Sequence, residues 1–305
     1  MERLLAAEGI DSSTRELLTG CLLGARAEAA EAEVQAAFLS AGGLAPTVLQ
    51  MPGARLPDVL VRAPVPYVRP LVAWLQERPP YVLALADREG AGIEIHHGGI
   101  QQRIVRRTLG PDDDKSGAGR DSRRRRKHPA ADPDERHALR VAGALCEALL
   151  CSPIELLLIA GDIRAVHGID RHLPGGLRRR VTIRHVPCVL DRDEPARRRA
   201  PRVEQHVHAW VAEENRRFLS RITGEGNSAD WVVEGATATL EALSRGRARV
   251  LVVVDPRDAP SADAAPLADV ALRAALLTGA EARLLPPGTP NTPAEGIGAL
   301  CRFGG

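Results

Sequence analysis

The residues with the strongest chemical character lie in one stretch, "KSGAGRDSRRRRK", Lys115 to Lys127. An arginine can donate paired hydrogen bonds to phosphate oxygens, and a glycine lets the backbone approach a ligand closely. The stretch is therefore consistent with a flexible tip that inserts arginines among the phosphates of a nucleic acid. Taken alone, it also fits a solvated polar linker, which is the commoner use of such a charge run.

Two further basic clusters lie in the same third of the chain, "LRRRVTIR" at 177–184 and "RRRAPR" at 197–202. The net charge is only +2, so local clustering rather than total charge favours nucleic acid as a partner. Nucleotide-loop motifs are missing. There is no G-x-x-x-x-G-K-[ST], and the "GAG" at 117–119 is not directly preceded by a strand or followed by a helix, as a dinucleotide fingerprint requires.

The residue types that carry catalysis or bind metals do not form a recognisable motif. The five cysteines include no C-x-x-C pair and the nine histidines include no H-E-x-x-H, so no metal site is expected. Ser228, in "GNSAD", does not lie in the G-x-S-x-G pattern of a nucleophile elbow. Asp162 follows an apolar run and fits a helix cap better than an acid. The residues themselves therefore predict no catalytic residue, no metal and no cofactor.

Length and composition predict a globular protein of two or three domains. The chain has 305 residues, 44% of them hydrophobic and 26% charged, as in ordinary soluble proteins. The first residues, "MERLLAAEGIDSS", do not resemble a secretory signal. No apolar run approaches the roughly 20 residues that span a bilayer. We expect a cytoplasmic protein that contacts no membrane.

The first part of the chain is the hardest to interpret. The Ala/Glu-rich segment 27–39 predicts a helix that ends near Gly42-Gly43. Short apolar runs between 47 and 68 fit brief strands, because several prolines interrupt them. A helix is expected near 71–77.

The middle part has clearer patterns. Residues 81–99 predict a β-hairpin, and "IVRRTLG" at 104–110 extends the sheet. Asp132, Pro133 and Glu135 form a capping box with proline in the first helical position. The helix that follows has apolar residues on one face. "IELLLIA" at 154–160 predicts a buried strand, and 203–222 a long amphipathic helix.

The last part alternates helix and strand, with helices expected over 233–245 and 268–277 and strands over 249–255 and 282–286. This order predicts an α/β sandwich with a small sheet. The whole chain is thus expected to be α/β with three domains: an N-terminal domain over 1–77, a middle domain over 78–224 that carries a basic loop at 112–130, and a C-terminal α/β domain over 225–305.

The order of these segments resembles a known family. "YVLALADREGAGIEIHHGG", then Lys115 with a Gly-containing loop, then Ser122 and an arginine run, then a helix and "IELLLIAGDIRAV", is similar to the middle domain of archaeo-eukaryotic class-one peptide release factors. "VVEGATATLEALSRGRARVLVVVDP" resembles their C-terminal domain. The resemblance covers roughly 78–305 and is to the bacterial branch, with Pelota-like rescue factors and Balon-type hibernation factors as relatives.

The resemblance also shows a departure. The Gly-Gly-Gln that places a water at the peptidyl-tRNA ester in the family is absent, and Arg120 and Asp121 stand where Gly and Gln are expected after Gly119. The resemblance therefore implies a translation factor that mimics a tRNA and occupies the ribosomal A site without releasing peptide, in ribosome hibernation or rescue. Its partners would be the ribosome and its rRNA. An elongation-factor GTPase is an open candidate for a second partner.

The resemblance makes the basic loop the tip of the middle domain, where it would bind rRNA phosphates. The RNA-binding residues implied are Lys115, Ser116, Gly117, Gly119, Arg120, Ser122, Arg123, Arg124, Arg125, Arg126, Lys127, Arg178, Arg179 and Arg180. Two alternatives stay open. One is a peptidyl-tRNA hydrolase or tRNA-cleaving rescue enzyme with an altered loop that uses Ser116 or Ser122. The other is a scaffold that kept the fold for a different partner.

Overall fold

The computed structural model describes residues 11–28, 34–40, 47–51, 54, 56, 59–87, 90–98, 103–109, 133–150, 152–186, 196–223, 231–255 and 266–303. Contacts divide the chain into two compact units, Arg78–Val211 and the combination of Met1–Glu77 with Ala212–Gly305. Both units contain a sheet covered by helices, so the expected mixed α/β class is confirmed. The expected division into three domains stays a prediction.

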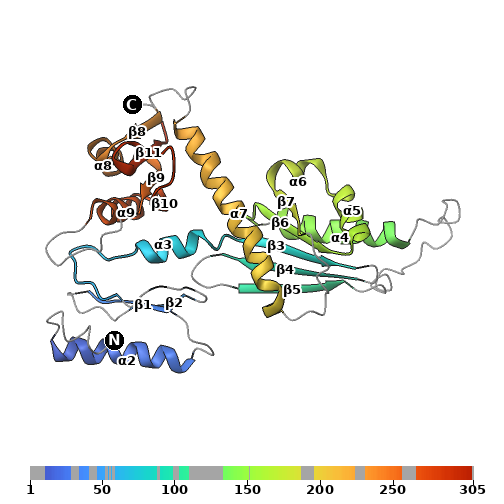
Figure 1. Ribbon diagram of the computed structural model, residues 1–305, viewed down its shortest axis with the longest axis horizontal. Helices are drawn as coiled ribbons and strands as arrows, with labels where there is room; N and C mark the ends of the chain where they lie inside the picture. The colour runs from blue at the N-terminus through green and yellow to red at the C-terminus, as the bar shows by residue number, and fades with distance from the viewer. Residues whose placement is uncertain are drawn as a thin grey trace, which may run out of the picture. The chain divides into compact units, whose positions relative to one another are not determined.

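The unit Arg78–Val211 is built on a five-stranded sheet of order β5-β4-β3-β6-β7 (Figure 1). β3, β4 and β5 form an antiparallel meander, and β6 and β7 continue the sheet in parallel. The predicted hairpin, its extension and the buried strand are confirmed. The strands are β3 (Tyr81–Ala86), β4 (Ala91–His97), β5 (Arg103–Leu109), β6 (Leu156–Gly161) and β7 (Thr182–His185).

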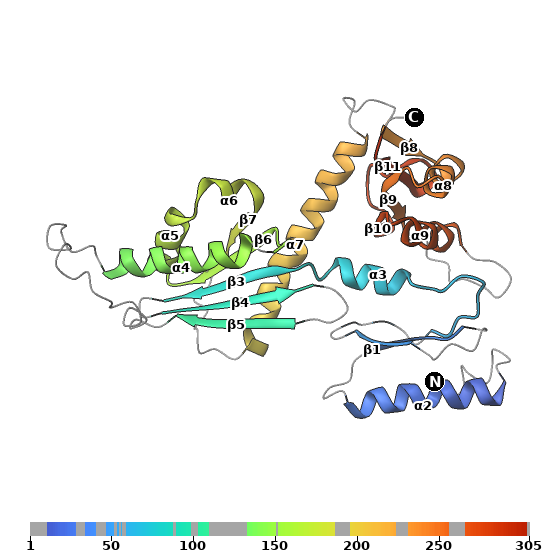
Figure 2. The ribbon, with the colours of Figure 1, turned by 180° about the vertical axis from the view of Figure 1, so that it is seen from behind.

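Helices cover this sheet on both faces (Figure 1, Figure 2). One face packs against α4 (Pro133–Leu150), α5 (Ile163–His172) and α6 (Gly175–Arg180), and the opposite face packs against the first part of α7 (Ala196–Thr223). Side chains alternate along each strand, so neighbours face opposite helices. Val82 and Ala84 contribute to the first core, whereas Leu83 and Leu85 contribute to the second.

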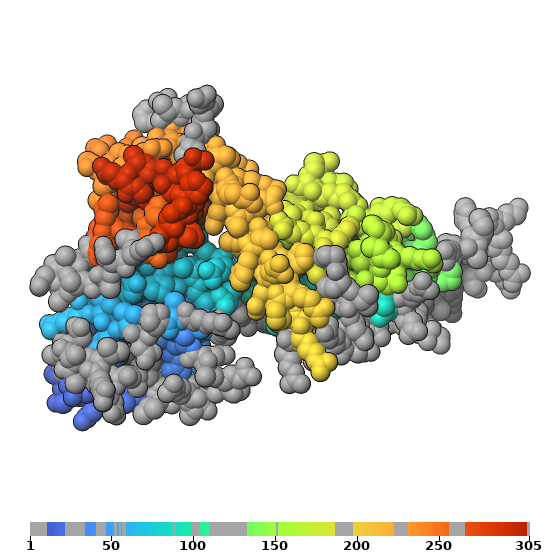
Figure 3. All heavy atoms as spheres, in the orientation of Figure 1, coloured from blue at the N-terminus to red at the C-terminus, as the bar shows by residue number. Residues whose placement is uncertain are grey.

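The sequence also predicts the two long helices correctly. α4 begins at Pro133, and its apolar face is buried as expected; the cap residue Asp132 lies outside the described residues. α7 buries Val203, Val207 and Trp210 against β3 and β6. α7 forms part of the surface seen in Figure 3.

The turn after β6 explains the Gly161-Asp162 pair. Gly161 has φ of +122°, and a Cβ there would meet the carbonyl oxygen of Ala86 at 1.9 Å, so only glycine fits. The Asp162 carboxylate accepts hydrogen bonds from the backbone N–H groups of Arg164 (2.9 Å) and Ala165 (3.2 Å). Asp162 is therefore the N-cap of α5, as the sequence favoured.

The second unit contains a four-stranded sheet of order β10-β9-β11-β8. Its strands are β8 (Val232–Glu234), β9 (Ala248–Val254), β10 (Glu281–Leu285) and β11 (Ile297–Cys301). α8 (Ala236–Ser244) and α9 (Leu267–Thr278) cover one face, and the end of α7 contributes Phe218, Leu219 and Ile222 to the core on the other. The predicted order of helix, strand, helix and strand is confirmed. The helix expected from residue 233 begins only at Ala236, because the residues before it pair as β8. Gly279 ends α9 in the left-handed conformation.

The beginning of the chain corrects one prediction. The helix lies at α2 (Ser12–Glu28), and the expected helix over 27–39 is wrong, because β1 (Val34–Phe38) pairs there with β2 (Thr47–Met51). The Ala-rich composition favours a helix only weakly, and pairing with a second strand overrides that preference. The helix expected near 71–77 is confirmed as α3 (Arg69–Gln76).

α3 is attached to the four-stranded sheet through a buried arginine. The Nε of Arg69 donates to both carboxylate oxygens of Asp269 on α9, at 3.1 and 3.2 Å, and Nη1 donates to Asp255 at 2.7 Å. The Arg69 and Asp269 side chains are 1% and 0% exposed. The ring of Tyr67 lies 4.8 Å from the guanidinium carbon. These ion pairs thus bind the N-terminal end of α3 to α9 and to the end of β9.

The other end of α3 completes the edge of the same sheet. The backbone N–H of Leu284 donates to the Gln76 side-chain oxygen at 2.8 Å, and the Gln76 amide donates to the Leu284 carbonyl at 3.2 Å. β10 is an edge strand, so this amide satisfies backbone groups that would otherwise have no strand partner.

Removing the buried arginine should destabilise this unit. We expect Arg69→Ala to lower the free energy of unfolding by about 3 kcal/mol, because the carboxylate of Asp269 is left buried without its main counter-charge. Arg245→Ala is the matched control, since its pair with Glu241 is largely exposed and should contribute less than about 0.5 kcal/mol. Urea denaturation measures both, and equal losses in the two variants would contradict the anchoring role.

Candidate nucleic-acid interface

The basic loop itself lies outside the described residues. This holds for Lys115, Ser116, Gly117, Gly119, Arg120, Ser122, Arg123, Arg124, Arg125, Arg126 and Lys127, so their RNA-binding role stays a prediction. The structure does describe the two elements that the loop connects. In sequence the loop lies between β5, an edge strand of the five-stranded sheet that is described to Leu109, and α4, which is described from Pro133.

The three arginines of α6 differ in what they contact. Arg178 donates to the carbonyl oxygens of Asp170 and Leu173 and pairs with the Asp170 carboxylate at 3.0 Å. Arg180 donates to the carbonyl oxygen of Leu149 at the end of α4. Both therefore satisfy backbone acceptors at the ends of α5 and α4. Arg179 is exposed and has no recorded partner among the described residues, so its whole guanidinium is available to a ligand.

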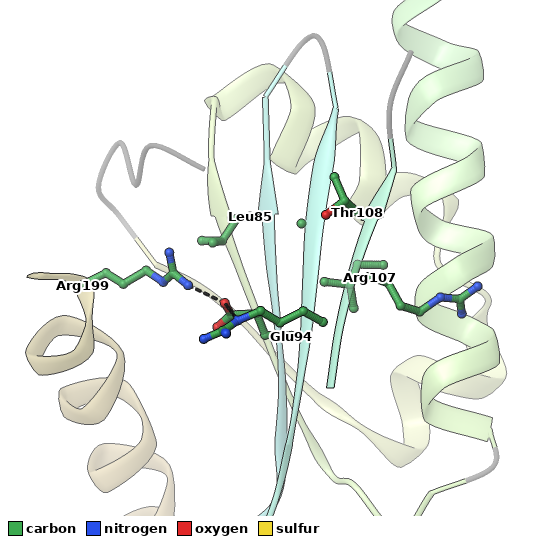
Figure 4. Close-up of a pocket in the computed structure, with 8 residues that line it drawn as sticks. Leu85, Glu94, Arg107, Thr108 and Arg199 are labelled. Atoms are coloured by element: carbon green, nitrogen blue, oxygen red, sulfur yellow. Dashed lines mark hydrogen bonds and ion pairs between the residues drawn. The ribbon is translucent and has the colours of Figure 1, made fainter. Parts of the chain in front are cut away.

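A pocket that sequence reasoning did not find lies on the α7 face of the five-stranded sheet (Figure 4). It is an open cavity of about 390 Å³ between the edge of the sheet and the beginning of α7. Three of its lining residues are arginines and one is a glutamate. The lining consists of Leu85, Gly92, Ile93, Glu94, Arg106, Arg107, Thr108 and Arg199.

Glu94 is the centre of the charged groups in this pocket. Its carboxylate accepts a hydrogen bond from Nε of Arg106 on β5 at 3.0 Å and another from Arg199 on α7. The Nε2 of His96 lies 3.3 Å from its other oxygen. The Glu94 side chain is only 8% exposed. One carboxylate therefore joins two neighbouring strands to the helix that covers them.

The electrostatics keep this carboxylate ionised. Burial by itself raises the pKa of Glu94, but hydrogen bonds from His96 and Arg106 and the charge of Arg199 outweigh it and bring the pKa to about 2. His96 is held in place because its ring stacks on Tyr81, with centroids 4.2 Å apart.

The arginines around Glu94 are not equivalent. Arg106 is 61% exposed and Arg199 only 7%, so Arg106 presents its terminal nitrogens to solvent while Arg199 is a packed anchor. Arg107 points away from this face, toward α4, where it pairs with Glu147 at 3.4 Å (Figure 4). The alternation of a strand explains why two adjacent arginines have such different surroundings.

The described residues hold no group of three histidine, cysteine, aspartate or glutamate side chains that could bind a metal ion. His96 and His97 are adjacent on β4 and so lie on opposite faces of the sheet, and His206 is less exposed than His208 on α7. Within the same described ranges, no helix combines the length and the apolar character needed to cross a membrane.

Comparison with known proteins places the middle of the chain in a family. The profile of the bacterial archaeo-eukaryotic release factor family 2 matches residues 80–227. This range contains the basic loop, the pocket and nearly the whole unit Arg78–Val211. A search among curated proteins finds no significant sequence match.

Several solved structures are similar over most of the chain. Archaeoglobus fulgidus Pelota is 16% identical, with 77% of this chain and 68% of that chain covered and a TM-score of 0.39. An archaeal Pelota described as ribosome-bound with ABCE1 is 14% identical, with 89% and 78% covered and a TM-score of 0.45. Dom34 of S. cerevisiae is 11% identical, with 75% and 64% covered and a TM-score of 0.40.

Neutralising Glu94 should weaken the packing of α7 against the five-stranded sheet. We expect Glu94→Gln to lower the free energy of unfolding by about 3 kcal/mol, because the nearly buried Arg199 loses the carboxylate that it faces. Glu147→Gln is the matched control: it also removes the partner of a β5 arginine, but this pair is 47% and 72% exposed and should contribute less than about 0.5 kcal/mol. Urea denaturation with a spectroscopic readout compares them. Similar losses in both variants would show that Glu94 is no special anchor.

The same carboxylate predicts a pH dependence. The pKa of Glu94 falls from an ordinary 4.5 to about 2 on folding, so its stabilisation is complete above about pH 4.5 and is lost as the pH falls toward 2. The difference in free energy of unfolding between the wild type and Glu94→Gln should therefore stay constant from about pH 7 to 5 and shrink below about pH 4. Denaturation curves at a series of pH values measure it, and a difference that grows on acidification would argue against this role.

Proposed function

Because this chain is a bacterial archaeo-eukaryotic release-factor-like protein, we propose that it binds the ribosome and occupies the A site without catalysing peptide release. Its role would be that of a hibernation or rescue factor acting in the cytoplasm. The observation that carries the proposal is the family match over 80–227, the range in which the basic loop lies.

The loop sequence supports binding rather than hydrolysis. No Gly-Gly-Gln occurs anywhere in the chain, and the loop reads Gly119-Arg120-Asp121 where the family's catalytic motif is expected. A cation thereby replaces the second glycine, and an anion replaces the glutamine that positions water at an ester. The arginines that follow suit contacts with RNA phosphates, which position a protein without reading its sequence.

The electrostatics of the described part of the same unit support an RNA partner. Arg106 and Arg179 are exposed, and the terminal nitrogens of Arg106 and the whole guanidinium of Arg179 have no recorded acceptor there. Guanidinium groups of this kind form paired hydrogen bonds with phosphate oxygens. A GTPase partner is a further part of the proposal: Dom34 interacts with Hbs1, and copurification from a bacterial extract with a GTP analogue would identify the equivalent here.

Co-sedimentation with purified 70S ribosomes tests the binding. We expect the full chain to sediment with ribosomes at about 50 mM salt and to lose affinity on the order of 10³-fold at about 200 mM, because several phosphate contacts are replaced by counterions. A variant in which residues 112–130 are replaced by a Gly/Ser linker should bind more weakly and with a shallower salt dependence.

The control for this variant is its circular dichroism spectrum and thermal transition, which should match those of the wild type. Failure of the wild type to sediment at any salt concentration would overturn the proposal and favour a scaffold with another partner.

Single-turnover peptide release from stalled ribosomes separates binding from catalysis. We expect no release above the rate without protein, because the chain lacks the glutamine that positions water. Release that disappears when residues 112–130 are replaced, or in Ser116→Ala or Ser122→Ala, would overturn the non-catalytic role and establish a rescue enzyme. Gel analysis of the tRNA in the same samples distinguishes ester hydrolysis from tRNA cleavage.

A further inference from the structure

We propose that the pocket beside Glu94 binds a phosphate group of an RNA backbone, with Arg106 as the residue that contacts it. This inference rests on the proposed function and adds a second RNA contact that is separate from the basic loop. It is carried by the cavity, by the geometry of Arg106 and by the charge balance around Glu94.

The guanidinium of Arg106 is oriented by a hydrogen bond from only one of its three nitrogens. Its Nε donates to Glu94 at 3.0 Å, which fixes the plane of the guanidinium. Its side chain is 61% exposed, and among the described residues no acceptor is recorded for its two terminal nitrogens. A planar group held at one nitrogen and open at the other two is suited to a paired contact with phosphate oxygens.

Arginines outnumber carboxylates among the residues that line the pocket. Two guanidinium groups, Arg106 and Arg199, contact the one carboxylate of Glu94. Because the pKa of Glu94 is about 2, protonation does not change this balance near neutral pH. Arg107 adds nothing here, since it pairs with Glu147 on the opposite face.

The remaining lining is suited to an anion. Thr108 is exposed on the same face of β5 as Arg106, two residues further along. Its hydroxyl can donate a hydrogen bond. Gly92, its partner on β4, has no side chain to occupy the space between them. The cavity of about 390 Å³ is near the small end of the roughly 300–1,000 Å³ of ligand pockets, and its open side leaves room for a chain of nucleotides.

The beginning of α7 carries a further arginine. None of the residues described in its first turn is acidic. Arg198 is exposed in the same turn.

Two substitutions on adjacent residues of one strand test the site in the full-length chain. Arg106→Gln removes the proposed contact, and Arg107→Gln removes the same charge from the opposite face. We expect Arg106→Gln to weaken binding to 70S ribosomes on the order of tenfold and to reduce the slope of log affinity against log salt by about 1. Arg107→Gln should change the affinity by less than about twofold, since its charge faces away and is screened. Thr108→Val should give a smaller loss than Arg106→Gln.

A titration with RNA in the absence of ribosomes tests the phosphate site separately from the proposed ribosome binding. Fluorescence anisotropy with a short labelled single-stranded RNA should show the same order of affinities, wild type and Arg107→Gln above Thr108→Val and Arg106→Gln. Inorganic phosphate should compete with the RNA only at high concentration. Thermal denaturation checks that every variant is folded like the wild type.

If the wild type binds ribosomes and Arg106→Gln and Arg107→Gln have equal effects, the pocket is not a phosphate site and the proposed function stands. If the wild type binds the RNA in the expected order but not the ribosome, the proposed function fails and the pocket stands. If inorganic phosphate binds tightly while Arg106→Gln leaves RNA affinity unchanged, the site serves a free anion and the inference is overturned.

Discussion

The buried carboxylate of Glu94 is the interaction on which the described part of the middle unit depends. Two strands and a helix meet at it, because Arg106 of β5 and Arg199 of α7 both donate to the same glutamate of β4. A glutamate in this position would be unfavourable alone, and the arginines and His96 reverse that cost. In the same arrangement only the Nε of Arg106 donates to Glu94, and the side chain is largely exposed. Structural and functional roles thus share one cluster: the carboxylate holds the sheet against α7, and the excess guanidinium faces solvent, where an RNA phosphate can reach it.

Much of the fold could be predicted because local patterns and tertiary packing agree. Pro133 with its acidic first turn begins α4, Gly279 ends α9, and the apolar run of β6 is buried on both faces. The prediction failed over 27–39, where an Ala-rich segment forms β1 because a partner strand is present. Nothing local in the sequence encodes that pairing. The attachment of α3 to the four-stranded sheet was equally hidden, since Arg69 and Asp269 lie 200 residues apart in the chain.

The candidate site also has one part that the sequence showed, the basic loop, and one part that it did not show, the pocket beside Glu94. Composition singled out the basic loop, with seven lysines or arginines among thirteen residues, but such a run also fits a solvated linker. The family resemblance made it a candidate RNA contact, and that role stays a prediction. The pocket could not be found this way: its charged residues come from β4, β5 and α7, and only strand register brings Glu94 opposite Arg106. A signal was present in hindsight, since a glutamate among apolar residues in "GIEIHH" needs a buried partner, and "IVRRTL" offers one arginine to each face. For α6, spacing did not show that Arg178 and Arg180 contact backbone carbonyls while Arg179 does not.

We propose that this release-factor-like chain sits in the ribosomal A site and holds RNA with arginines instead of cleaving an ester. A cryo-EM map of the full chain on a bacterial 70S ribosome tests it most directly. The map should show the unit that contains β3 to β7 in the A site, with residues 112–130 among rRNA phosphates near the peptidyl-transferase centre. Density for the chain at any other place on the ribosome, or a loop that faces away from rRNA, would contradict the claim.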